Sequence, residues 1–183
     1  METSEKIALL YLRLNGFFLM QHFTVFVTKK QRHVDVLGVR LKGSKEEVNG
    51  TNLVIDEEFV KILNGFDEDV HLWGEVGKGR SFPREKETYC RKIFGDSDTL
   101  KKVHFNLDTA GEDLHPSNDI IVVPAGRCRK FILERFAQME SEEVSTKLKH
   151  LTRVTKEGSW NWSEEFLADL LYLRRKGFLR EDS

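Results

Sequence analysis

The stretch at residues 71–79, HLWGEVGKG, predicts a strand of a sheet that carries a charge. Its first half is aromatic and aliphatic, which is typical of a strand. Glu75 lies inside this apolar run, and Lys78 follows just beyond it. Burying an isolated carboxylate costs on the order of several kcal/mol or forces it to take up a proton, so a buried Glu75 needs a partner.

A second acidic residue, Asp35, lies in the stretch HVDVLGVRL at residues 33–41. This stretch is apolar on both faces apart from Asp35 and Arg40, a pattern typical of a strand in the middle of a covered sheet. If the two strands are neighbours, the carboxylates of Asp35 and Glu75 point to one edge of the sheet. Such a pair predicts a bound Mg²⁺ or Mn²⁺, because these hard divalent cations prefer oxygen ligands.

The rest of the chain predicts an alternation of helices and strands. Helical spacing, capping residues and glycine stops predict helices at residues 4–15, 56–64, 85–94, 131–150 and 163–177, and apolar runs predict strands at residues 17–27, 33–41, 70–77, 101–107 and 118–126. This order predicts an α/β fold with a mixed central sheet. We expect an α/β core at residues 1–125 and a C-terminal helical extension at residues 126–183 that packs on it.

The composition excludes several classes of protein. With 183 residues, of which 39% are hydrophobic and 32% charged, the chain has the length and composition of one globular domain. The formal net charge of -1 does not by itself indicate a partner. Cys90 and Cys128 lack the paired spacing of a zinc ribbon. Without a start that resembles a signal peptide, or an apolar run of about 20 residues, we expect a cytoplasmic protein that does not enter a membrane.

The chain resembles the PD-(D/E)XK nuclease superfamily, which has a restriction-endonuclease-like or Holliday-junction-resolvase-like fold. The matching features are Glu5 on the first helix, Asp35 in HVDVLGVR, Glu75 in GEVGKG, the basic glycine-containing loop after it and the next helix. They span residues 1–125, and the order helix–strand–strand–strand–helix–strand agrees with the family's αβββαβ core. The resemblance implies a metal-dependent nuclease in which Asp35 and Glu75 hold the metal, Glu5 is an auxiliary metal ligand, and a nearby lysine assists.

One position departs from the family pattern. The family's lysine lies two residues after the glutamate, where this chain has Gly77, and Lys78 comes one residue later. On a regular strand Lys78 would face away from Glu75, but a bulge at Gly77 would turn it back. Arg91 or Lys92 on the following helix is the alternative source of positive charge, a migration seen in this superfamily. If none of them reaches Glu75, the site binds nucleic acid or metal without cutting.

Basic residues on the loop and helix after Glu75 predict contacts to the phosphates of a nucleic acid, and the alternative is an ordinary solvated surface. These residues are Lys78, Arg80, Arg84, Arg91 and Lys92. His33, close to Asp35, either assists proton transfer or is incidental.

Two features of the C-terminal extension leave alternatives open. Cations at the start of the long helical segment oppose the helix dipole, so either a phosphate partner relieves them or they form a surface without a partner. These cations are Arg127, Arg129, Lys130 and Arg135. Trp160 and Trp162 either stack on bases or anchor a helix against the core.

The hypothesis that follows is a Mg²⁺- or Mn²⁺-dependent nuclease that hydrolyses phosphodiester bonds, with DNA as the expected substrate. Asp35 and Glu75 hold the ion and Lys78 assists. The alternative is a catalytically inactive nuclease-fold protein that binds nucleic acid or a partner protein. A third hypothesis is an accessory subunit whose C-terminal helices pair with another chain. A homodimer would agree with an enzyme that cuts both strands of a duplex.

Overall fold

The structure, a computed structural model, describes residues 3–27, 30–45, 47–48, 51–79, 82–95, 99–106 and 108–140. Several of the expected features lie outside these residues. They are the helix at residues 163–177, residues 141–150 of the preceding helix, Arg80, Trp160 and Trp162.

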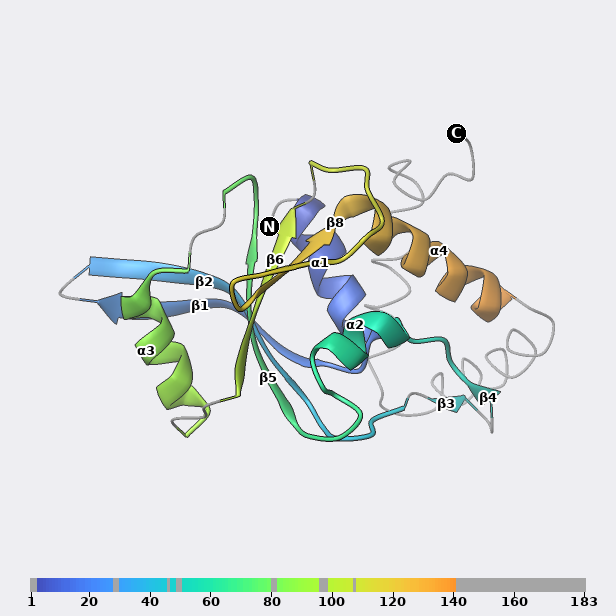
Figure 1. Ribbon diagram of the computed structural model, residues 1–183, viewed down its shortest axis with the longest axis horizontal. Helices are drawn as coiled ribbons and strands as arrows, with labels where there is room; N and C mark the ends of the chain where they lie inside the picture. The colour runs from blue at the N-terminus through green and yellow to red at the C-terminus, as the bar shows by residue number, and fades with distance from the viewer. Residues whose placement is uncertain are drawn as a thin grey trace, which may run out of the picture.

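A six-stranded mixed sheet forms the centre of the described chain, in the order β1-β2-β5-β6-β8-β7 (Figure 1). The strands are β1 (Phe18–Val27), β2 (Lys30–Arg40), β5 (Val70–Val76), β6 (Leu100–Asn106), β7 (His115–Ser117) and β8 (Ile120–Pro124). Neighbours β1, β2 and β5 are antiparallel, β5, β6 and β8 are parallel, and β7 returns antiparallel to β8. A separate two-stranded hairpin joins β3 (Glu47–Val48) and β4 (Thr51–Asn52). The α/β class and the mixed central sheet are therefore confirmed.

The helices divide between two hydrophobic clusters. The larger cluster contains buried residues of α1 (Thr3–Leu14), α2 (Glu57–Ile62) and α4 (Ala125–Glu140), whereas the smaller one contains Cys90 of α3 (Arg84–Ile93). In Figure 1, α3 accordingly lies apart from the other three helices, with the sheet between them. The expected helices at residues 4–15, 56–64 and 85–94 are confirmed to within two residues at each end.

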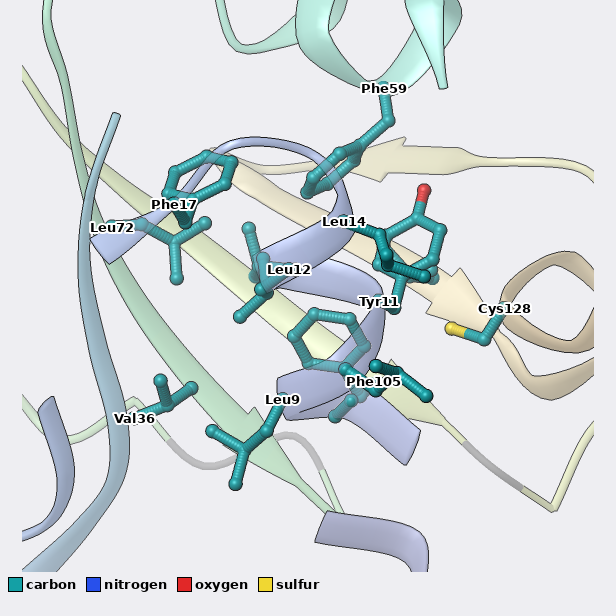
Figure 2. Packing of buried hydrophobic residues seen from close by; sticks show 14 of the residues in the cluster. Leu9, Tyr11, Leu12, Leu14, Phe17, Val36, Phe59, Leu72, Phe105 and Cys128 are labelled. Atoms are coloured by element: carbon teal, nitrogen blue, oxygen red, sulfur yellow. The ribbon is translucent and has the colours of Figure 1, made fainter. Parts of the chain in front are cut away.

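Tyr11 joins four elements at the centre of the larger cluster (Figure 2). Its ring centroid lies 5.2 Å from that of Phe59 on α2, 6.1 Å from that of Phe105 on β6 and 5.4 Å from that of Phe131 on α4. The ring planes are tilted or perpendicular, which is the favoured arrangement for aromatic pairs. The first described part of the C-terminal extension therefore contributes directly to the core.

Gly74 lies at the closest approach of β2 and β5, directly opposite Val36. A methyl group added at Gly74 would lie 2.5 Å from Cγ1 of Val36, which is fully buried. We expect Gly74→Ala to lower the free energy of unfolding by about 1–3 kcal/mol, because the packed sheet must shift to admit the methyl group. Urea denaturation followed by circular dichroism measures this loss. Gly79→Ala is the control, since no atom of the described residues lies within 4 Å of a methyl group there; equal stabilities would contradict the predicted crowding.

Among the helices of the described residues, none combines the length and the apolar composition needed to cross a bilayer.

Candidate functional site

The register of β2 and β5 brings the two predicted carboxylates together. Leu37 pairs with Trp73 and Val36 with Gly74, so continuing by one residue places Asp35 opposite Glu75. Residues directly opposite one another in an antiparallel pair project to the same face, with Cα atoms about 4.5–5.5 Å apart. That face is the one covered by α3, because Leu37 and Trp73 belong to the same cluster as Cys90.

Glu75 is only 9% exposed, and one of its carboxylate oxygens accepts two hydrogen bonds. The indole nitrogen of Trp73 donates a hydrogen bond to Oε1 of Glu75 at 2.7 Å, and Nζ of Lys86 donates to the same oxygen at 3.0 Å. Burial raises the pKa of the Glu75 carboxyl, the hydrogen bonds from Trp73 and Lys86 lower it, and the charge of Asp35 adds to the rise. Burial outweighs the two hydrogen bonds, so the pKa of the Glu75 carboxyl lies above its ordinary value.

Asp35 is fixed by the backbone of the neighbouring strand. Its Oδ2 accepts a hydrogen bond from the amide of Val76 at 2.8 Å. Oδ1 of Asp35 and Oε2 of Glu75 accept no hydrogen bond from any residue that the structure describes. Two oriented carboxylates therefore each keep one oxygen available, which is what an oxygen-preferring divalent ion requires.

The lysine beside Glu75 is Lys86, and this corrects the expectation for Lys78. The side chain of Lys78 is 89% exposed, and its Nζ lies 3.6 Å from Asp108. The side chain of Lys86 is 12% exposed and forms an ion pair with Glu75. Lys86 belongs to the first turn of α3, so the positive charge comes from the following helix, as the sequence allowed, but from a residue other than Arg91 or Lys92.

The backbone at Gly77, two residues after Glu75, disfavours a lysine at this position. Gly77 has φ +145°, in the region that favours glycine, so any other side chain at this position is strained. Its amide donates to the carbonyl of Phe105 at 3.1 Å, and His104 donates from Nε2 to the Gly77 carbonyl at 2.9 Å. β5 ends at Val76, just before Gly77, and Lys78 lies against Asp108 and is not turned back toward Glu75.

Glu5, the expected auxiliary metal ligand, lies beside a histidine of β1. Its Oε2 is 3.8 Å from Nε2 of His22, whose backbone has φ +50° within β1. Within the described ranges, no group of three or more His, Cys, Asp and Glu side chains is arranged to hold a metal ion. The structure thus brings Asp35 and Glu75 together and leaves Glu5 with His22.

Comparisons with models of protein families, with curated proteins and with solved structures found no match to this chain. The geometry of the site therefore carries the functional argument.

The predicted phosphate-contacting residues have different environments. Arg91 forms an ion pair with Glu87 at 3.0 Å, one turn earlier on α3. Arg84 and Lys92, also on α3, are exposed. Of this set, only Arg80 lies outside the described residues, and none of the described members forms the ion pair with Glu75 that Lys86 makes.

Two of the four cations expected at the start of α4, Arg127 and Lys130, form ion pairs with carboxylates of this chain. Arg127 donates to both carboxylate oxygens of Asp56, at 2.7 and 2.6 Å, and lies 2.8 Å from Glu58. Lys130 lies 2.7 Å from Glu112. Arg135, almost fully buried, donates to the carbonyl of Val54. Arg127, Lys130 and Arg135 therefore each have a partner within this chain.

Helical spacing is the signal that would have identified Lys86. Lys86 and Cys90 are four residues apart, and Phe94 follows after another four. Side chains at this spacing share one helix face. Cys90 is buried and Phe94 packs against the same cluster, so a lysine in register with them faces the sheet instead of the solvent.

Proposed function

We propose that this chain is a Mg²⁺- or Mn²⁺-dependent nuclease that hydrolyses phosphodiester bonds in nucleic acid, with DNA as the expected substrate. The observation that carries the proposal is the juxtaposition of Asp35, Glu75 and Lys86. Two carboxylates on adjacent strands each keep an oxygen available, and a buried ammonium group lies against one of them. This set has the chemistry of the PD-(D/E)XK site, with its lysine supplied by a helix.

The topology supports a restriction-endonuclease-like core. Helix α1 is followed by the antiparallel strands β1, β2 and β5, then by α3 and by β6, which is parallel to β5. Leaving out the small insertion of β3, β4 and α2, this is the order helix–strand–strand–strand–helix–strand. The carboxylates lie on the second and third of these strands, and the lysine lies on the helix between the third and the fourth.

The donor set fits a magnesium-like ion. Mg²⁺ is usually bound through one or two carboxylates, with waters and substrate phosphates completing its octahedral shell. When bound, such an ion polarises the phosphate and activates water for hydrolysis. Asp35 and Glu75 would hold it through their available oxygens, and the Val76 amide and the Trp73 indole would keep the two carboxylates in orientation.

Lys86 would place a positive charge where the phosphate gains negative charge during hydrolysis. We expect Lys86→Met to lower metal-dependent cleavage by about a hundredfold or more, because a preorganised charge is lost, while Mn²⁺ still binds to the carboxylates. Single-turnover cleavage and calorimetric Mn²⁺ titration measure the two effects separately. Lys102→Met is the matched control, because Lys102 forms an ion pair with Glu87 of α3 at 2.7 Å and is similarly buried. Equal cleavage by the two variants would exclude Lys86 from catalysis.

The test of the proposal as a whole is a cleavage assay with a panel of linear duplex, single-stranded and branched DNA and of RNA. We expect cleavage in Mn²⁺ and none in EDTA. Absence of metal-dependent cleavage of any member of the panel would contradict the proposed activity.

The second candidate function is a catalytically inactive nuclease fold that binds nucleic acid. It is favoured by the ion pair itself, because Lys86 already neutralises Glu75 and the family's lysine position is Gly77. Binding of DNA without cleavage, together with no carboxylate-dependent binding of Mn²⁺, is the result that this function predicts.

A further inference from the structure

A hollow of about 410 Å³ opens beside the carboxylate pair. Its lining comes from two segments, the start of β2 and the N-terminal end of α3. The lining residues are Gln31, Arg32, His33, Pro83 and Lys86.

One residue, Lys86, connects the hollow with the candidate site. Lys86 lines the hollow and also forms the hydrogen bond of 3.0 Å to Glu75. His33 lies two residues before Asp35 on the same strand. A nucleotide in this hollow therefore lies next to the lysine that forms the ion pair with Glu75.

Among the described residues that line the hollow, several are basic and none is acidic. Arg32 and Lys86 are cationic, and His33 and Gln31 offer further nitrogen donors. Arg32 and His33 are exposed, and Arg32 forms no ion pair with any residue in the described ranges. Oγ1 of Thr24 lies 3.4 Å from Nδ1 of His33, which leaves the other ring nitrogen for a ligand. An unneutralised guanidinium beside a histidine and a lysine favours a phosphate group.

We propose that this hollow binds one phosphate-bearing nucleotide of the substrate strand, next to the bond that is cleaved. Its volume of about 410 Å³ lies within the range of small-ligand pockets, about 300–1,000 Å³, and suits a single nucleotide. Arg32 and His33 contact the phosphate, Gln31 donates to the sugar or base, and the ring of Pro83 provides an apolar surface. This inference rests on the proposed nuclease function, since it takes Asp35 and Glu75 as the point of cleavage.

The test is binding of a fluorescein-labelled single-stranded oligodeoxynucleotide to the full chain in EDTA, measured by fluorescence anisotropy. We expect Arg32→Gln to weaken binding about tenfold, because a charge-assisted contact to phosphate is lost. We also expect it to reduce the slope of log K against log salt concentration by about 0.7, the value for one phosphate contact on a single strand. Lys61→Gln is the control, because Lys61 is an exposed lysine on α2, away from the α3 face. Equal affinities of the two variants would overturn the proposal.

Two further measurements separate the possible failures. If wild type binds the oligonucleotide through Arg32 but cuts nothing in Mn²⁺, the nucleotide site stands and its place next to a cleaved bond is overturned. If thymidine 5′-monophosphate binds as tightly as the oligonucleotide, and through Arg32, the hollow takes a free nucleotide and the assignment to a substrate strand is overturned. If wild type cuts the oligonucleotide, we expect Arg32→Gln to raise KM, with Mn²⁺ binding unchanged.

Discussion

Replacement of Asp35 by Asn, or of Glu75 by Gln, is expected to lower metal-dependent cleavage by at least about a thousandfold. Each substitution removes a carboxylate oxygen that accepts no hydrogen bond from any described residue. Losing the ion that this oxygen holds costs about 4 kcal/mol of transition-state stabilisation, and each 1.36 kcal/mol corresponds to a factor of about ten in rate. Single-turnover cleavage of the best substrate in the panel, with Mn²⁺ at saturating concentration, measures the loss.

The control for this prediction is Asp108→Asn, which removes an exposed carboxylate that pairs with Lys78. We expect it to cut like the wild type. Circular dichroism shows whether each variant is folded. Folded Asp35→Asn or Glu75→Gln protein that cuts within tenfold of the wild-type rate would rule out the carboxylate pair as the catalytic site.

The affinity for Mn²⁺ should also depend on pH through Glu75. A metal-bound carboxylate must be deprotonated, and burial raises the pKa of Glu75 above its ordinary value of about 4.3. We therefore expect Mn²⁺ binding to weaken on acidification at a higher pH than an exposed glutamate would require. Calorimetric titration across the acidic range measures this dependence.

The second large effect is expected at Asp56, where Asp56→Ala should lower the free energy of unfolding by about 3–5 kcal/mol. The hydroxyl of Tyr11 donates to Asp56 at 2.5 Å, Arg127 donates to both carboxylate oxygens, and the amide of Phe59 donates to Oδ1 at 3.1 Å. Removing the carboxylate leaves a largely buried guanidinium without its main partner and removes the N-cap of α2. Chemical denaturation at neutral pH measures the loss.

Glu58→Ala is the matched control for Asp56→Ala, because both carboxylates contact the same guanidinium. Glu58 lies 2.8 Å from Arg127, but its side chain is 61% exposed, whereas that of Asp56 is 7% exposed. Exposed ion pairs contribute about 1 kcal/mol or less, so Glu58→Ala should change the stability far less. Similar losses for the two variants would show that burial does not govern the strength of this network.

The same network predicts how stability depends on pH. The hydrogen bonds from Arg127 and Tyr11 hold the pKa of Asp56 below its ordinary value despite the opposing effect of burial. A carboxyl group whose pKa is lower in the folded state stabilises the fold above its unfolded pKa of about 3.9, and this stabilisation is lost as the pH falls. The comparison runs from about pH 5, roughly one unit above that pKa, to about pH 2, roughly two units below it. Over this range the wild type should lose more of its free energy of unfolding than Asp56→Asn.

The sequence predicted the strands and the pairing of Asp35 with Glu75 because both depend on local patterns. Apolar runs mark the strands, and a carboxylate inside each run is conspicuous. Once β2 and β5 are neighbours, strand alternation places both side chains on one face. The position of the lysine could not be predicted from the pattern of a single strand. The ion pair between Lys86 and Glu75 depends on how α3 packs on the sheet.

The partners of Arg127 were unpredictable for a different reason. Asp56 precedes it by 71 residues, and no local spacing connects them. Viewed along the chain, a cation at a helix start favours an anionic ligand. In the fold, α1, α2 and α4 pack around Tyr11. This packing places the carboxylate of Asp56 against the guanidinium of Arg127. Long-range pairing of this kind follows only from the packing of helices.

The hydrogen bond from Trp73 to Glu75 makes the fluorescence of Trp73 a probe of the candidate site. The indole is fully buried and donates to the carboxylate at 2.7 Å, so its emission responds directly to what happens at Glu75. A paramagnetic ion such as Mn²⁺ at that carboxylate quenches the indole, whereas diamagnetic Mg²⁺ does not. Once Trp160 and Trp162 are replaced by phenylalanine, the intrinsic fluorescence of Trp73 distinguishes an ion at Glu75 from one bound elsewhere, with no label attached.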